Sequence, residues 1–268
     1  MTRAMELPRP ALLGHRGASV ERPENTLASF ARALELGADG IETDAHLTRD
    51  GVVILAHDDS ALRTAGVSAR WSDADFAEVT RWDAGATFTD RDGVSWRGRG
   101  CAAPALEDCL AEFPGVFFNV DIKSRRPAMV TAVVAAVRRA RAEDRVLLTS
   151  FDERTLARVR AVGYAGATGI GASAALAALF APIPLLRRSP LGGRALQIPD
   201  RYRALDLGAP WVAARCRALG LRLDYWVVND PSRARALLAS GADGIVTDDV
   251  AALRGVISSA RAARAPSS

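Results

Sequence analysis

The chain has 268 residues, of which 49% are hydrophobic and 25% charged, and its formal net charge is +4. This size and composition suit one large globular domain with a sizeable core and exclude a largely disordered chain. No apolar run approaches the roughly 20 residues of a membrane span, and residues 1–10 lack the apolar stretch of a signal peptide.

The distribution of charged residues indicates which kinds of binding partner to expect. The arginines are spread along the chain without a clustered run, which argues against a nucleic-acid-binding role. A mildly basic enzyme with an anionic small-molecule substrate fits the same charge. Cys101, Cys109 and Cys216 have no metal-type spacing and are expected to be small core residues in a reducing compartment. We therefore expect a cytoplasmic protein; the oligomeric state is left open.

Strand-like runs and helical patterns alternate along the chain, which predicts a parallel sheet with crossover helices. The predicted strands are 11–14, 40–44, 52–57, 116–122, 146–150, 165–170, 195–198, 223–228 and 244–247. The predicted helices lie near 25–36, 73–81, 105–112, 127–141, 153–162, 172–180, 209–219, 231–239 and 249–263.

Nine strands are one too many for an eight-stranded barrel. Residues 45–51 are too few for a parallel crossover, and Arg49-Asp50-Gly51 favours a turn, so 52–57 is predicted to fold back as a hairpin. This hairpin should place His57 opposite Asp44. Eight parallel strands remain, which predicts a (β/α)8 TIM barrel.

Residues 1–268 are expected to form one catalytic domain with its core at about 11–250. Residues 58–103 form a long insertion that starts beside His57, and long loops of this kind are often functional. Residues 260–268 are expected to be a frayed tail. The segment 172–193 is apolar at first and then contains Arg187 and Arg188. Contact with a lipid surface or with a long-chain substrate is one interpretation. A barrel helix with its connecting loop is the favoured one.

The strand ends carry the candidate chemistry. Glu42 and Asp44 alternate on one strand and should point into the barrel at its carboxyl end, where barrel enzymes place their active sites. Two adjacent carboxylates repel, and a divalent cation would resolve this; a pair neutralised by arginines is the alternative. Asp121 and Lys123 share one face of another strand. They could supply a carboxylate for a metal and an ammonium group for a phosphate oxygen, or they could form a simple ion pair.

Two histidines fall at predicted strand ends. His15, between Gly14 and Gly17, and His57 could act as a general base and a general acid near neutral pH. Arg16 next to His15 could bind a phosphate oxygen, or form an outward ion pair.

Two further residues are candidates for contact with the substrate. Glu24, just before a predicted helix, should lie above the first strand, within reach of His15 or the metal. Trp226 could pack against the carbon portion of a substrate or fill the core.

The ordered set of segments resembles the glycerophosphodiester phosphodiesterase family over about residues 11–250. The segments that carry the resemblance are His15-Arg16-Gly17-Ala18, Pro23-Glu24-Asn25-Thr26, Glu42-Thr43-Asp44, Leu47-Thr48-Arg49-Asp50-Gly51, His57-Asp58, Asp121-Ile122-Lys123, Trp226-Val227-Val228-Asn229 and Thr247-Asp248. A departure is Asp121, where the family commonly has Glu.

The resemblance implies a TIM barrel that hydrolyses glycerophosphodiesters to sn-glycerol 3-phosphate and an alcohol with a divalent cation, Mg²⁺, Ca²⁺ or Mn²⁺. By matching position, Glu42, Asp44 and Asp121 would bind the metal. His15 and His57 would be the acid–base pair, and Arg16 and Lys123 would bind the phosphate. The alternatives are a lysophospholipase D-like diesterase and a non-catalytic phosphate-binding barrel.

Overall fold

Parallel strands form the centre of the molecule. The computed structural model describes residues 6–188 and 191–264. The strands that run parallel to one another are β1 (Ala11–His15), β2 (Gly40–Leu47), β4 (Phe117–Ile122), β5 (Val146–Thr149), β6 (Ala167–Thr168), β7 (Ala195–Ile198), β10 (Arg222–Tyr225) and β11 (Gly244–Thr247).

The sheet closes on itself. Its order is β6-β5-β4-β2-β1-β11-β10-β7, with each neighbouring pair parallel. A parallel bridge between Gly169 and Ala195 joins the strands at the two ends of this order. The predicted (β/α)8 barrel is thereby confirmed.

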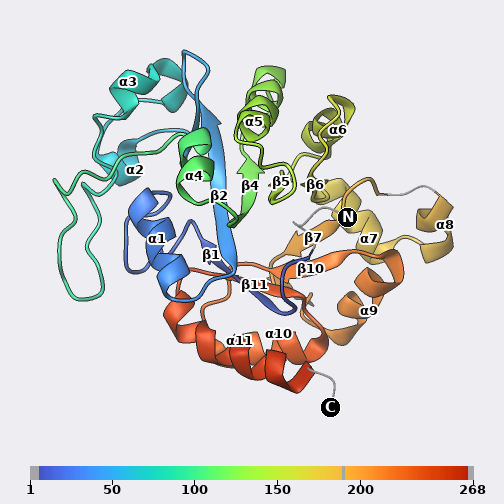
Figure 1. Ribbon diagram of the computed structural model, residues 1–268. Coiled ribbons are helices and arrows are strands. Elements are labelled where there is room, and N and C mark those ends of the chain that lie inside the picture. Colours follow the sequence, from blue (N-terminus) through green and yellow to red (C-terminus); the bar gives the residue numbers. More distant parts are fainter. Residues whose placement is uncertain (1–5, 189–190, 265–268) are drawn as a thin grey trace.

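Helices ring the barrel, as Figure 1 shows in a view along its axis. They are α1 (Leu27–Glu35), α4 (Leu106–Glu112), α5 (Pro127–Arg139), α6 (Glu153–Ala161), α7 (Ala172–Phe180), α8 (Ile183–Arg188), α9 (Pro210–Leu219), α10 (Pro231–Ser240) and α11 (Val250–Arg264). Local signals set several of their ends. The Thr26 hydroxyl accepts the backbone N–H of Ser29 and caps α1. Proline occupies the first position of α9 and α10, where its missing N–H costs nothing.

Side-chain alternation decides which residues face the barrel interior. On β2, Ile41 and Ala45 pack outward into the main core, which also contains Phe30 of α1. Glu42 and Asp44 therefore point inward. The interior below these carboxylates holds a small apolar cluster that includes Leu13, Phe117 and Val246. It also holds the buried ion pair between Arg222 and Asp224.

The hairpin after β2 exists, but its predicted register is wrong by one residue. β3 (Val53–Leu55) pairs antiparallel with β2, and Ala45 lies opposite Leu55. The connecting turn uses Gly51 with φ of 83°, a conformation that favours glycine. The backbone N–H of Ala56 donates to the Asp44 carbonyl at 2.9 Å, so Ala56 stands opposite Asp44. His57 follows one position later, at the open end of the barrel.

The insertion has structure of its own. It contains α2 (Leu62–Ala65), a 3-10 turn η2 (Trp71–Asp73) and α3 (Phe76–Val79), where the sequence predicted one longer helix over 73–81. A small apolar cluster that includes Ile54, Trp71 and Val79 holds it against β3. The insertion is also tied to the turn after β11, because Arg91 Nη2 lies 2.8 Å from Asp249 Oδ2.

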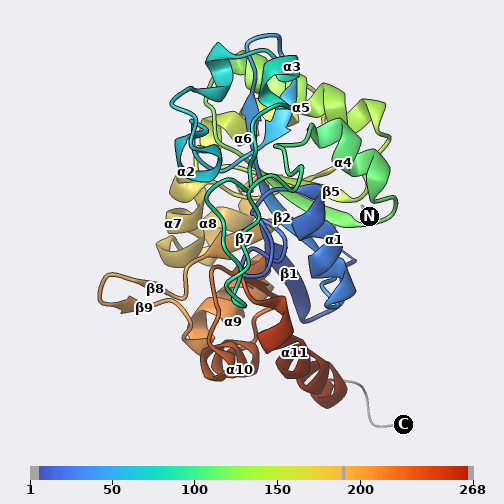
Figure 2. The ribbon, with the colours of Figure 1, turned by 90° about the vertical axis from the view of Figure 1, so that its left-hand side faces the viewer.

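Other differences lie in the second half of the chain. The short helix α8 and a small antiparallel ribbon, β8 (Arg201–Tyr202) with β9 (Leu205–Asp206), were not predicted; Figure 2 shows the ribbon projecting from the body of the molecule. The expected tail from residue 260 is wrong as far as Arg264, because α11 continues to that residue and Arg264 donates to the Leu238 carbonyl. Residues 265–268 of that tail lie outside the described residues.

Two further points concern the described residues. Cys101, Cys109 and Cys216 are free and buried, as predicted. No helix in the described part of the chain is long and apolar enough to cross a membrane.

Candidate active site

The predicted site residues meet where neighbouring strands end. His15 on β1 lies in register with Glu42 on β2, and Asp44 lies in register with Asp121 on β4. All four side chains occupy the inward positions of their strands, so the barrel brings together residues far apart in sequence. Glu42, Asp44 and Asp121, which we call the carboxylate row, therefore lie with His15 at one mouth of the barrel.

The turn after β1 requires small residues. Gly17 has φ of 88°, and a Cβ there would lie 2.2 Å from the Ser29 hydroxyl. A side chain at Gly14 would also collide, with the Gly17 carbonyl at 2.7 Å. Arg16 between them takes a positive φ of 57°. The two glycines let the chain turn against α1 and hold Arg16 over the barrel.

His15 is held by a carboxylate that the sequence analysis did not single out. Its Nδ1 lies 2.6 Å from Asp248 Oδ1, just beyond β11. Asp248 is itself fixed by donors from Ser19 at 3.0 Å and Asn229 at 2.8 Å. Burial opposes the charge, but hydrogen bonds from His15 and Asn229 lower the pKa of Asp248 to about 2. The aspartate is therefore ionised at neutral pH.

His57 has a matching partner. Its Nδ1 lies 2.7 Å from Asp58 Oδ1, and Asp58 also accepts from Arg63 Nε at 2.7 Å. Burial is outweighed by the hydrogen bonds from Arg63 and His57, which lower the pKa of Asp58 to about 2. Both histidines are thus oriented by an ionised aspartate.

These contacts fix the tautomers. An ionised carboxylate can only accept hydrogen bonds, so Nδ1 of each imidazole carries a proton. The other nitrogen, Nε2, is then free to accept or deliver a proton in the mouth. Burial would lower the pKa of His15, but the hydrogen bond to Asp248 and the charge of Glu42 raise it above its ordinary value. Such a pKa suits a general base working near neutral pH.

Lys123 lies between two of the carboxylates. Its Nζ is 2.8 Å from Asp44 Oδ1 and 2.8 Å from Asp121 Oδ2. Burial would lower the pKa of Lys123, but Asp121 and Asp44 raise it well above its usual range. Burial also works against ionisation of Asp44, yet Lys123 and Arg16 hold the pKa of Asp44 below its ordinary value. For Asp121 burial prevails and raises the pKa.

Glu42 is the unbalanced member of the row. Its Oε2 is buried and has no hydrogen-bond partner in the described part of the chain. The basic nitrogen that forms an ion-pair contact with it, His15 Nε2, is 3.8 Å away. Burial first, and then the charge of Asp44, raise the pKa of Glu42 to about 8. A buried carboxylate of this kind costs free energy unless a cation compensates it.

This donor set fits a divalent cation by its chemistry. Three carboxylates supply the oxygen ligands that Mg²⁺ and Ca²⁺ prefer, and Glu42 Oε2 has an unused lone pair directed at no donor. Among the described residues, no group of three His, Cys, Asp or Glu side chains is placed so that it could hold a metal ion. In this arrangement the Lys123 ammonium occupies the space between Asp44 and Asp121.

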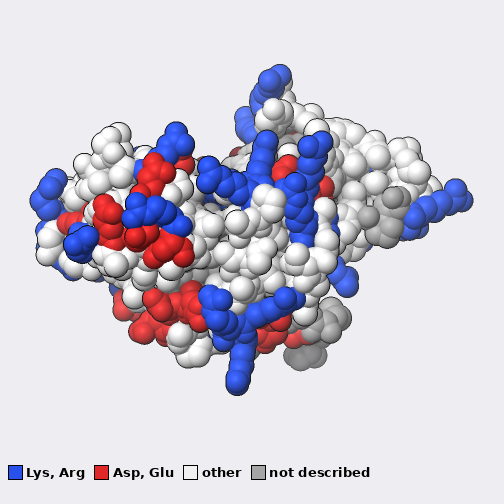
Figure 3. All heavy atoms as spheres, turned by 90° about the horizontal axis from the view of Figure 1, so that it is seen from above, with Lys and Arg blue, Asp and Glu red and all other residues white. Residues whose placement is uncertain are grey.

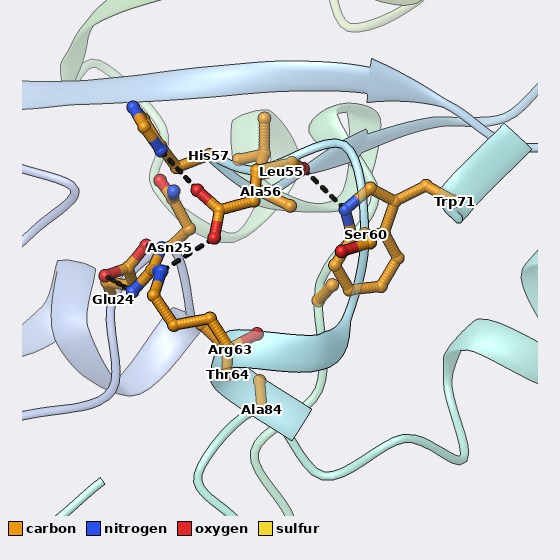
Figure 4. A pocket seen from close by; sticks show the side chains of 12 residues that line it. Glu24, Asn25, Leu55, Ala56, His57, Ser60, Arg63, Thr64, Trp71 and Ala84 are labelled. Atoms are coloured by element: carbon orange, nitrogen blue, oxygen red, sulfur yellow. Dashed lines mark hydrogen bonds and ion pairs between the residues drawn. The ribbon is translucent and has the colours of Figure 1, made fainter. Parts of the chain in front are cut away.

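Glu24 lies at this mouth, but its carboxylate is already engaged. It accepts from Arg16 Nη1 at 3.1 Å and from both terminal nitrogens of Arg63 at 2.8 and 2.7 Å. Figure 4 shows Glu24 and Arg63 together in the pocket that also holds His57. Burial would raise the pKa of Glu24, but the hydrogen bond from Arg63 and the charge of Arg16 lower it. The geometry makes Glu24 the anchor of two arginines.

Arg16 also faces the carboxylate row. Its Nε lies 3.3 Å from Asp44 Oδ2 but has no hydrogen-bond partner there. A buried guanidinium with a free N–H at the edge of the mouth can donate to an anionic ligand. This is the inward of the two orientations considered for Arg16.

Asn25 and His46 support the site from behind. The Asn25 amide donates to Asp44 Oδ2 at 3.2 Å and accepts from the Thr43 hydroxyl at 2.6 Å, while Thr26 next to it caps α1. His46 Nε2 lies 3.0 Å from the His57 carbonyl and helps to hold that loop. The sequence gives no sign of the contact between Asn25 and Asp44, which lie 19 positions apart.

Aromatic side chains border the mouth. The Trp226 ring packs edge-on against Phe151, with the ring centroids 5.7 Å apart. Phe151, which follows β5, is 61% exposed. Trp226 also packs on the apolar cluster inside the barrel, so it combines a core contact with a position at the rim. Phe151 and Trp226 therefore form an apolar wall at the mouth.

The comparisons with known proteins agree with this geometry. The model of the glycerophosphoryl diester phosphodiesterase family matches residues 15–252. The chain is 31% identical over 258 residues to a probable glycerophosphodiester phosphodiesterase 2 of Mycobacterium tuberculosis, covering 91% of this chain and 89% of that protein.

Solved structures share the fold. A putative glycerophosphoryl diester phosphodiesterase from Silicibacter pomeroyi superposes with a TM-score of 0.78 at 26% identity, over 97% of this chain and 98% of that one. An Oleispira antarctica phosphodiesterase, solved with the product sn-glycerol-3-phosphate, superposes with a TM-score of 0.78 at 23% identity, over 96% of this chain and 100% of that one.

Proposed function

This chain belongs to the glycerophosphoryl diester phosphodiesterase family and is a phosphoric diester hydrolase, and from that premise we propose that it cleaves glycerophosphodiesters into sn-glycerol 3-phosphate and an alcohol. One observation carries the proposal. Two imidazoles, each held at Nδ1 by an ionised aspartate, present Nε2 to a mouth that also contains three carboxylates and an ammonium group. The product seen in the Oleispira neighbour supports the choice of substrate.

His15 is assigned as the general base. Its Nδ1 proton is committed to Asp248, so Nε2 is the nitrogen that accepts a proton from the nucleophile. The nucleophile is either water or the 2-hydroxyl of the glycerol. The hydroxyl would expel the alcohol and give a cyclic phosphate, which water must then open to sn-glycerol 3-phosphate. Either nucleophile must be oriented toward Nε2, and the barrel supplies this orientation by fixing His15 on the end of β1.

His57 is assigned as the general acid. A positive charge on His57 favours ionisation of Asp44 and Asp121, whereas His15 lies beside Glu42. The two imidazoles therefore face different members of the carboxylate row. This separation suits one proton leaving the nucleophile and one reaching the departing alcohol oxygen.

Cationic groups stabilise the phosphate. Lys123 stays protonated, and Arg16 has an N–H without a hydrogen-bond partner at the same edge, so both can donate to phosphate oxygens. Glu42, Asp44 and Asp121 would hold a divalent cation, Mg²⁺, Ca²⁺ or Mn²⁺, which supplies Lewis-acid stabilisation of charge on the phosphate when bound.

Turnover of glycerophosphocholine, followed with and without a chelator, tests this proposal. We expect chelation to abolish activity and one of the three cations to restore it. His57→Gln should reduce kcat by about 10²–10⁴-fold, while Asp59→Asn, a change at an exposed neighbouring residue, should leave it unaltered. Full activity after thorough chelation or in His57→Gln would refute the metal or the histidine assignment respectively.

A second candidate substrate is a lysophospholipid. The exposed Phe151 and its contact with Trp226 favour it, because they provide apolar surface at the mouth beyond what a deacylated diester needs. Comparing kcat/KM on a lysophospholipid and on glycerophosphocholine separates the two. Loss of lysophospholipid cleavage alone in Phe151→Ser would support this candidate, and no cleavage of any lysophospholipid would remove it.

A further inference from the structure

Large apolar side chains are exposed on one side of the barrel. The described residues contain eleven exposed large hydrophobic side chains, and six of them fall between positions 176 and 211. We call these six the apolar rim: Leu176, Phe180, Leu185, Tyr202, Leu205 and Trp211. Such clustering is unusual for a surface that faces only water.

Several members of the rim lie next to one another in pairs. Leu176 and Phe180 lie one turn apart on α7, and the Phe180 ring lies 6.2 Å from the Trp211 ring at the start of α9. Tyr202 and Leu205 face each other across the β8–β9 ribbon, which leads directly into α9. Figure 2 shows α7 and this ribbon on the same side of the molecule.

Basic residues outnumber acidic ones around the rim. Between residues 172 and 211, excluding 189–190, the basic residues are Arg187, Arg188, Arg194, Arg201 and Arg203. The acidic ones are Asp200 and Asp206, and Arg233 binds both, at 2.6 and 2.8 Å. Figure 3 shows the end of the molecule over α7 and α8 as largely uncharged, with basic side chains at its tip.

We propose that the apolar rim is a docking surface for an anionic lipid bilayer. Exposed Trp and Tyr together with Leu and Phe are suited to the boundary between headgroups and acyl chains. Arginines that outnumber the acidic side chains around them are attracted to anionic headgroups. A symmetric dimer through the same rim is disfavoured, because it would bring the basic residues of both copies into one interface. This inference does not depend on the proposed reaction.

Vesicle co-sedimentation tests the proposal. The full chain is mixed with vesicles of phosphatidylcholine alone or with phosphatidylglycerol added, at low and high salt. We expect binding that increases with phosphatidylglycerol content and weakens with salt. Phe180→Ser with Leu185→Ser should lower the partition coefficient about tenfold or more, and Arg187→Gln with Arg188→Gln about fivefold for each arginine.

Matched controls keep the test independent of folding. Leu62→Ser removes an equally exposed leucine from the insertion, and Arg235→Gln with Arg254→Gln removes two exposed arginines on other helices. These variants should bind like the wild type, and all variants should turn over a water-soluble diester at the wild-type rate.

Three results would overturn the proposal. These are no vesicle binding, binding that ignores phosphatidylglycerol, and equal binding by rim and control variants. Dimerisation in sedimentation velocity that the Phe180→Ser, Leu185→Ser variant abolishes, without vesicle binding, would assign the rim to a second copy instead.

Discussion

The substitution Asp248→Asn tests how the catalytic base is held. In the wild type, Asp248 Oδ1 faces His15 Nδ1 and Oδ2 accepts from Asn229 Nδ2. If the new amide keeps its oxygen toward His15, its NH₂ group opposes the Asn229 NH₂ group. If it flips, its NH₂ group faces His15 Nδ1 and forces the proton onto Nε2. The first arrangement loses the hydrogen bond with Asn229, and the second blocks the base. Both lose the hydrogen bond between His15 and an ionised carboxylate.

The size of the effect follows from that lost bond. A hydrogen bond to a charged group contributes about 1.5–3 kcal/mol, which corresponds to a loss of roughly 10- to 150-fold in kcat/KM. Asp248 also raises the pKa of His15. Without the negative charge that pKa falls, so the acid limb of the pH–rate profile should move to lower pH.

The assay is kcat/KM for a glycerophosphodiester across pH, with Asp249→Asn as the matched control. Asp249 is the next carboxylate in the chain, but it pairs with Arg91 and does not touch His15. We expect the control to keep the wild-type profile. If Asp248→Asn kept both the wild-type rate and the wild-type acid limb, the tautomer argument would be refuted.

Three further predictions concern the carboxylate row and its cations. Because burial raises the pKa of Glu42 to about 8, the metal-free folded protein binds this proton more tightly than the unfolded chain, so its stability should fall as pH rises from about 4.5 through 8. In Glu42→Gln, thermal melts in chelator should lose that slope, and an unchanged slope would contradict the burial argument. Lys123→Met should cut kcat/KM by about 10²–10³-fold. It should also lower metal-free stability, because Asp44 and Asp121 lose their cationic partner. Activity assays and denaturant melts test this, and wild-type values in both would contradict the role given to Lys123. Arg63→Ala should free Glu24 and Asp58 and reduce kcat, whereas Arg70→Ala, at the exposed Asp59 pair, should match wild type in the same assay.

Local patterns in the sequence were enough to predict the barrel and most of the mouth. Alternation on β2 placed Glu42 and Asp44 inside, and the short 45–51 segment excluded a ninth parallel strand. The hairpin register failed by one residue, because the turn around Gly51 spans residues 48–52 and periodicity does not fix its exact centre.

Long-range contacts explain what was missed. Asp248 lies 233 positions from His15 and Asn25 lies 19 from Asp44, so no local pattern connects either pair. The engagement of Glu24 by two arginines likewise depends on where the insertion folds. The apolar stretch at 172–186 was visible in the sequence, but its exposure and its contact with Trp211 depend on how α7 packs beside α9.

Product identification tests the central claim most directly. Glycerophosphocholine is incubated with the full chain and a divalent cation, and the phosphorus-containing product is identified by ³¹P NMR. We predict sn-glycerol 3-phosphate with release of choline, and no product after chelation. Formation of phosphocholine and glycerol, or an equal rate without metal, would contradict the proposed chemistry.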